Sequence, residues 1–208
     1  MFRLVTVIFV SVATLSGGVA LACQGPRIPS NAYEAINLNR INQALFSRVI
    51  VEWTNYYRCK AGQQPVRRVD SLTRAASTHS KNMARYQILS HETPARGAQT
   101  IKKRVNKASR RSKRYSENIS QYFAYQTGRS RFLIKDMSQC YFTQGGERVS
   151  VHTYASLGEI TVNDWINSPA HRRNSLNGYY NKSGAGVGVA FTDQRPCGLF
   201  YVSQTLAN

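Results

Sequence analysis

Two histidines and one glutamate stand in short polar stretches at which the helical and strand patterns stop. His91 lies in LSH, Glu117 lies in SENI, and His171 lies in SPAHRRN, just after an apparent helix end. Imidazole nitrogens and carboxylate oxygens suit a borderline divalent metal such as zinc. We therefore expect a zinc site at these three residues if the fold brings them together.

Three kinds of chemistry are open for such a cleft. A zinc ion with an open position would lower the pKa of a bound water and support hydrolysis of peptides or wall amides. The sequence shows no separate general base for that reaction. Ser168 lies near His171 in the sequence, which suggests a serine nucleophile with a histidine base. Ser168 is more simply explained as the end of a helix before Pro169. Alternatively the cleft holds no ligand, and Asn118 and Asn174 satisfy backbone groups around it.

Hydrophobic periodicity predicts the helices that must position these residues. Apolar residues recur at helical spacing over 33–59, 71–88 and 157–167. A further short helix is expected within the basic run 95–116. His79 falls on the core-facing side of the second helix, where we expect a buried histidine with a local hydrogen bond.

Strands are expected in the second half of the chain. Two of them end it, over 184–191 and 199–206, and in the first of these Gly184, Gly186 and Gly188 alternate with small apolar residues. One face of that strand is therefore bare backbone, which allows another element to approach closely.

An insertion over about 120–157 separates the glutamate motif from the last predicted helix. It contains a predicted β-hairpin with arms 132–142 and 148–154, joined through a glycine pair. His152 is expected to be exposed on the second arm. Because of its place in the chain, we expect the hairpin to shield the cleft.

The first 22 residues have the layout of a secretory signal. Arg3 precedes an apolar run over 4–15, and small residues precede a cleavage site after Ala22. The run is too short to span a bilayer, and no later segment is long and apolar enough. We expect export to the periplasm or the medium, with 23–45 as a linker and helix extension.

Cysteine usage fits an oxidising compartment. The four cysteines, at 23, 59, 140 and 197, form no C-x-x-C pair, so metal-thiolate spacing is absent. An even count in an exported chain predicts two disulfides, and we favour Cys140 with Cys197 because both lie in strand-like segments. Cys23 directly follows the cleavage site, so acylation of Cys23 in a lipoprotein is an alternative.

The charge is strongly positive, with 28 Lys and Arg against 10 Asp and Glu, a net charge of +18. For an exported protein this favours anionic lipid or envelope polymers as partners, and no specific nucleic acid is expected. The alternative is a solvated basic surface without a partner. The most basic run supplies the expected anionic-partner patch: Lys102, Lys103, Arg104, Lys107, Arg110, Arg111, Lys113 and Arg114.

Five stretches in order resemble the CAP superfamily, or SCP-like domain, of cysteine-rich secretory, venom antigen and pathogenesis-related proteins. They are VIVEWTNYYRCKAGQQPV, LTRAASTHSKNMARYQILSH, SENIS, DWINSPAHRRNSL and GAGVGVAF. The resemblance, with the bacterial exported branch, covers about residues 46 to 206, and it places the domain at 46–208.

The resemblance implies an α+β fold, an α-β-α sandwich around a mostly antiparallel sheet, here with the inserted hairpin. It also implies a cleft of two histidines and two acids that often binds a divalent metal. His91, Glu117 and His171 match three of these positions. The second acid is replaced by Ser168, since Glu159 is turned away on the helix and Asp164 lies a turn back.

The family is linked with sterol and lipid binding and with no general enzymatic activity. We therefore expect a binding protein more than an enzyme. The expected cleft rim is formed by Ser168, Asn118, Arg172, Arg173 and Asn174.

Overall fold

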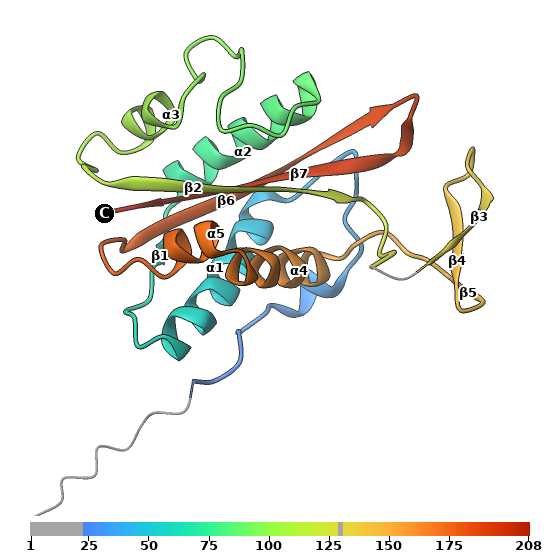
Figure 1. Cartoon of the computed structure of the whole chain (residues 1–208), viewed down its shortest axis with the longest axis horizontal. Helices are drawn as coiled ribbons and strands as arrows, with labels where there is room; N and C mark the ends of the chain where they lie inside the picture. Colours follow the sequence, from blue (N-terminus) through green and yellow to red (C-terminus); the bar gives the residue numbers. More distant parts are fainter. Residues whose placement is uncertain (1–22, 129–130) are drawn as a thin grey trace, which may run out of the picture.

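A computed structural model describes residues 23–128 and 131–208 (Figure 1), and the predicted signal at 1–22 lies outside the described residues. The main sheet has the strand order β1-β6-β7-β2. β1 runs parallel to β6, and the other neighbours are antiparallel. The four strands are β1 (Arg67–Arg68), β2 (Tyr115–Phe123), β6 (Lys182–Thr192) and β7 (Arg195–Ala207).

Helices cover both faces of this sheet. α2 lies along one face with α3 beside it, while α1, α4 and α5 lie on the other side (Figure 1). The predicted α-β-α sandwich is confirmed. The bounds are α1 (Gln43–Lys60), α2 (Asp70–Tyr86), α3 (Ile101–Ala108), α4 (Tyr154–Asn167) and α5 (Pro169–Ser175).

Alternation along β6 determines how closely the layers approach. Ala185 and Val187 belong to the large core formed with α1 and α4. Gly186, on the opposite face, lies so close to α2 that an added Cβ would fall 2.2 Å from the Ser77 Cα. The bare glycine face predicted from the sequence therefore lets α2 pack directly on the strand.

The first predicted helix was placed too early. A 3-10 turn, η1 (Ser30–Tyr33), stands where its start was expected, and α1 begins only at Gln43. The Asn37 side chain closes a local turn by accepting from the Asn39 backbone amide at 3.0 Å. Asn42 then caps α1 by accepting from the Leu45 amide at 3.0 Å. Polar turn and capping residues thus outweigh the apolar spacing between positions 33 and 42.

The insertion forms a small sheet instead of a long hairpin. Its strands are β3 (Leu133–Asp136), β4 (Tyr141–Gln144) and β5 (Glu147–Arg148), in the order β3-β4-β5. It packs against Phe123 and Tyr125 at the C-terminal end of β2 (Figure 1). Glu117 lies near the start of that strand, so the expectation that the insertion shields the cleft is wrong.

His152 was expected on the outside of that hairpin but is 7% exposed. β5 ends at Arg148, and His152 lies just before α4, where its Nδ1 contacts the Ser156 hydroxyl at 2.9 Å. Burial lowers the pKa of His152 to about 4.

Two disulfides link the periphery to the body. Cys140–Cys197 joins the small sheet to β7, as favoured from the sequence, and Cys23–Cys59 joins the N-terminal segment to the end of α1. Within 23–128 and 131–208, none of the helices has the length and apolar character needed to cross a bilayer.

Candidate functional site

Glu117 occupies an unusual position, because it is buried on the edge strand of the main sheet. The alternation of β2 points Glu117 and Ile119 towards α2, where Ile119 packs with Met83. Asn118 between them faces α5 on the other side of the sheet. Glu117 is 5% exposed, so its charge requires a partner inside the protein.

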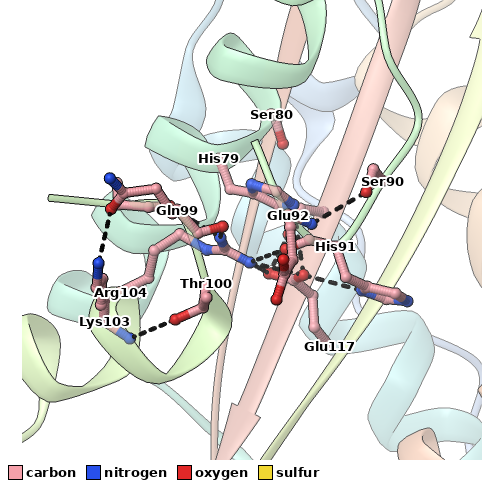
Figure 2. A network of polar contacts seen from close by, with 12 residues as sticks. His79, Ser80, Ser90, His91, Glu92, Gln99, Thr100, Lys103, Arg104 and Glu117 are labelled. Carbon is pink, nitrogen blue, oxygen red and sulfur yellow. Dashed lines mark hydrogen bonds and ion pairs between the residues drawn. The ribbon is translucent and has the colours of Figure 1, made fainter. Parts of the chain in front are cut away.

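That partner is Arg104, which comes from α3. Thr100 caps this helix by accepting from the Lys103 amide at 3.3 Å. Arg104 then lies one turn after Ile101 and directly before the fully buried Val105, on the inward face of the helix. Its Nη2 donates to both carboxylate oxygens of Glu117, at 2.8 Å each (Figure 2).

Arg104 also holds the segment between α2 and α3, which has no regular secondary structure. Its guanidinium donates to the carbonyl oxygens of His91 at 3.0 Å, Ala98 at 3.0 Å and Gln99 at 3.2 Å. The placement of Arg104 in an exposed patch was therefore wrong, because it is 4% exposed. Its spacing from Ile101 and Val105 was the signal that could have revealed an inward arginine.

Two histidines surround the same carboxylate. His91 Nδ1 lies 3.0 Å from Glu117 Oε1, and 54% of the His91 side chain is exposed. His79 Nε2 lies 3.4 Å from that oxygen, and the His79 side chain is fully buried. His79 is therefore buried as expected, but the charged residue beside it, Glu117, is distant from it in the sequence. Ser203 on β7 donates to Glu117 Oε2 at 3.4 Å.

Glu117 is held in its ionised form. Burial would raise its pKa, but the hydrogen bond from His91, the electrostatic interaction with His79, and the charge and hydrogen bonds of Arg104 lower the pKa below its ordinary value. Burial also lowers the pKa of His79, to about 4, although Glu117 acts in the opposite direction. His79 is thus uncharged at neutral pH, and Arg104 supplies the permanent positive charge.

His171 lies in α5, a short helix that starts at Pro169, and not in a loop after a helix end. Its ring is half-buried, and burial, followed by the nearby His91, lowers its pKa. In the described ranges, no hydrogen bond or ion pair joins the His171 ring to Glu117. The structure therefore brings His91 onto Glu117 and leaves His171 as a neighbour of His91.

Two asparagines attach α5 to β2. Asn118 donates to the His171 carbonyl at 3.3 Å and to the Ser175 hydroxyl at 3.0 Å. Asn174 donates to the Glu117 carbonyl at 3.3 Å and to Asn118 Oδ1 at 2.9 Å. These contacts give the asparagines the structural role considered from the sequence.

The remaining rim residues lie where α4 meets α5. Ser168 is half-buried between these helices, and its backbone amide donates to the Asp164 carbonyl at 3.0 Å. Arg172 and Arg173 are exposed on α5.

Comparison with known proteins identifies the domain. The family model for the cysteine-rich secretory protein family, CAP, matches residues 51–205. The chain belongs to this family. The resemblance expected from the five motifs is thereby confirmed.

Solved structures share the CAP fold at low sequence identity. An extracellular protein of Bacillus anthracis str. Ames that contains an SCP domain aligns with a TM-score of 0.51 and 18% identity. The alignment covers 82% of this chain and 42% of that one. An outer surface protein of Borrelia burgdorferi aligns with a TM-score of 0.52 and 14% identity, covering 81% of this chain and 96% of that one. No curated protein matched.

The His91, Glu117 and His171 set does not fit a zinc ion in this CAP domain as it stands. The Arg104 guanidinium donates to both Glu117 oxygens, so the carboxylate that would have to bind the zinc ion is already paired with a cation. Across the described parts of the chain, no three His, Cys, Asp or Glu side chains are grouped so as to hold a metal.

Glu117 is equally unsuited to act as a general base. Arg104, His91 and Ser203 contact its oxygens, and its lowered pKa makes it a weak base. The arrangement instead joins α2, α3, β2 and β7 through one buried carboxylate.

Removal of either member of the buried pair should destabilise the fold strongly. We expect Arg104→Met or Glu117→Met to lower the free energy of unfolding by about 3–5 kcal/mol, because the other charge is left unpaired. The double variant should lose clearly less than the sum of the two. Urea unfolding of all four proteins measures this coupling.

The surface pair Arg68–Asp70, at 2.7 Å, provides a control, since Asp70 is exposed and Arg68 is half-buried. Its cycle, Arg68→Met with Asp70→Asn, should couple by less than about 1 kcal/mol. Equal coupling in the two cycles would contradict a special role for the buried pair.

Acid should destabilise the protein before its carboxylates titrate. His79 and His152 have pKa values of about 4 in the folded protein, so unfolding takes up protons between that pH and the ordinary value of 6.5. The free energy of unfolding should be highest above this window, and each histidine should lower it by about 1–2 kcal/mol at about pH 5.

Urea unfolding at about pH 7 and pH 5 measures this loss. His152→Asn, whose amide can replace the bond to Ser156, should remove roughly half of the difference between the two pH values. An unchanged difference in that variant would show that His152 does not contribute.

Zinc should not bind tightly to the unmodified cleft. Isothermal titration with zinc chloride at neutral pH should give the same weak heats for the wild type and for His91→Ala/His171→Ala. One-to-one binding that is lost in the variant would mean that zinc displaces Arg104 from Glu117, and the sequence-based metal site would then stand.

Proposed function

We propose that this CAP protein is an exported binding domain without catalytic activity, whose ligand is an anionic polymer or lipid surface of the cell envelope. Export is supported by the predicted signal, by the two disulfides and by the extracellular and outer surface structures that share the fold. The Cys23 sulfur takes part in a disulfide and would not be free for acylation, so we favour the form without a lipid.

The observation that carries this proposal is the exposed positive charge on and after α3. Seven of the eight cations predicted for the patch are exposed, and no acidic residue lies within 95–116. Such a surface attracts polyanions over a distance and releases them as salt rises. The exposed members are Lys102, Lys103, Lys107, Arg110, Arg111, Lys113 and Arg114.

In this proposal the polar cluster around Glu117 has a structural role. It holds α3 against β2 through Arg104 and Glu117, and α5 against β2 through Asn118 and Asn174. Hydrolysis is not proposed, because His91, Arg104 and Ser203 already contact the Glu117 oxygens that would have to bind a metal or accept a proton.

Binding to anionic vesicles should be strong at low salt and should depend on the patch. We expect binding to phosphatidylglycerol vesicles, little binding to phosphatidylcholine vesicles, and loss of binding in about 0.5 M salt. A patch variant should bind at least about tenfold more weakly, as measured by vesicle co-sedimentation. It replaces four exposed cations by glutamine: Lys102, Lys103, Arg110 and Arg111.

A distal variant of equal charge change is the control and should bind almost as the wild type does. It replaces four exposed cations away from α3 by glutamine: Arg27, Arg131, Lys135 and Arg195. Absence of wild-type binding to anionic vesicles and to soluble polyphosphate at low salt would overturn the proposal.

A further inference from the structure

A groove of about 730 Å³ lies between α2, the turn at 95–98 and the end of α3. Figure 1 shows α2 and α3 on the same side of the sheet, with the intervening segment linking them. The α2 wall is a helical stripe that includes Ser71, Thr78 and Asn82, and it differs from the Ala76–Ser77 surface packed on β6. The groove is therefore outside the layer contacts that build the fold.

The walls of this groove are positively charged. Arg74 and Arg85 come from α2, Arg96 from the turn and Lys107 from α3, and all four are exposed residues. Part of the buried Arg104 also lines it. No acidic residue is among the lining residues, so nothing in the lining neutralises these cations.

The groove stays open because its other lining residues are mostly small. Ala75 lies on the α2 wall, Ala95, Gly97 and Ala98 form the turn, and Ala108 ends α3. Gly97 has a φ of +77°, which favours glycine, and no atom lies within 4 Å of the place of an added Cβ. The long cationic side chains thus surround space and do not fill it.

The turn that forms one wall is supported by the buried ion pair. Arg104 donates to the carbonyls of Ala98 and Gln99, while the same guanidinium contacts Glu117. The wall is therefore positioned before any ligand arrives, which lowers the ordering cost of binding.

We propose that this groove binds a ligand that carries two or more phosphate groups. This inference rests on the proposed anionic ligand and names its site and chemistry. Three of the four exposed cations are arginines, whose planar guanidinium donates two parallel hydrogen bonds to phosphate. The volume exceeds that needed for one phosphate and is in the range of small-ligand sites. Thr78 and Asn82 can hydrogen-bond hydroxyl groups between the phosphates.

The test uses a groove variant and two sources of phosphate. The groove variant replaces the four exposed lining cations by glutamine: Arg74, Arg85, Arg96 and Lys107. Binding of soluble inorganic polyphosphate and of phosphatidylglycerol vesicles is measured for this variant, the distal variant and the wild type. Polyglutamate of similar charge tests whether phosphate is preferred to carboxylate. Thermal unfolding confirms that each variant is folded.

We expect the groove variant to bind polyphosphate roughly 10- to 100-fold more weakly than the distal variant, with polyglutamate binding weakly to all of them. Binding of polyphosphate alone assigns a soluble polymer, and additional groove-dependent binding of vesicles assigns the phosphates of neighbouring lipid head groups. Equal loss in the groove and distal variants would overturn the location in the groove, and equal binding of polyglutamate and polyphosphate would overturn the assignment of a phosphate ligand, while either result leaves the proposed anionic surface intact. No wild-type binding to any of the probes would overturn the proposed function as well.

Discussion

The contact between Arg104 and Glu117 is the interaction on which this region of the molecule depends. A carboxylate buried on an edge strand is stable only if a charge of opposite sign is buried with it. Arg104 meets that need, and its Nη1 and Nη2 also donate to carbonyl groups of a segment that lacks regular structure. Together with the backbone hydrogen bonds from Thr93 to Gln99 and from Ala98 to Ala95, this one side chain orders the segment between α2 and α3.

The rest of the architecture leaves room for this contact. α2 approaches β6 closely because glycines form the facing surface, and this brings the buried His79 close to Glu117 on the edge strand. Successive side chains of β2 point to opposite faces of the sheet. Glu117 joins the α2 side, and Asn118 joins the α5 side, so the edge strand is attached to helices on both faces.

Features that depend on regular periodicity could be predicted from the sequence. These include α2, the two terminal strands and the glycine face of β6, because pattern and spacing directly reflect which surface is buried. The family motifs also indicated His91 and Glu117 as neighbours. Arg104 could not be recognised within a run of cations, since charge alone does not separate a solvated face from a buried partner. His152 was misplaced for a related reason, because strand alternation was extended beyond the point at which the chain turns into α4.

The disulfide pattern has a consequence for how the chain matures. Cys23 pairs with Cys59 and Cys140 pairs with Cys197, so each cysteine is bonded to its nearest cysteine neighbour in the sequence. During export from the N-terminus, an oxidase that joins cysteines in their order of emergence would form both native bonds directly. Joining in this order leaves no mispaired bond to be exchanged, so the native pattern itself requires no disulfide isomerisation.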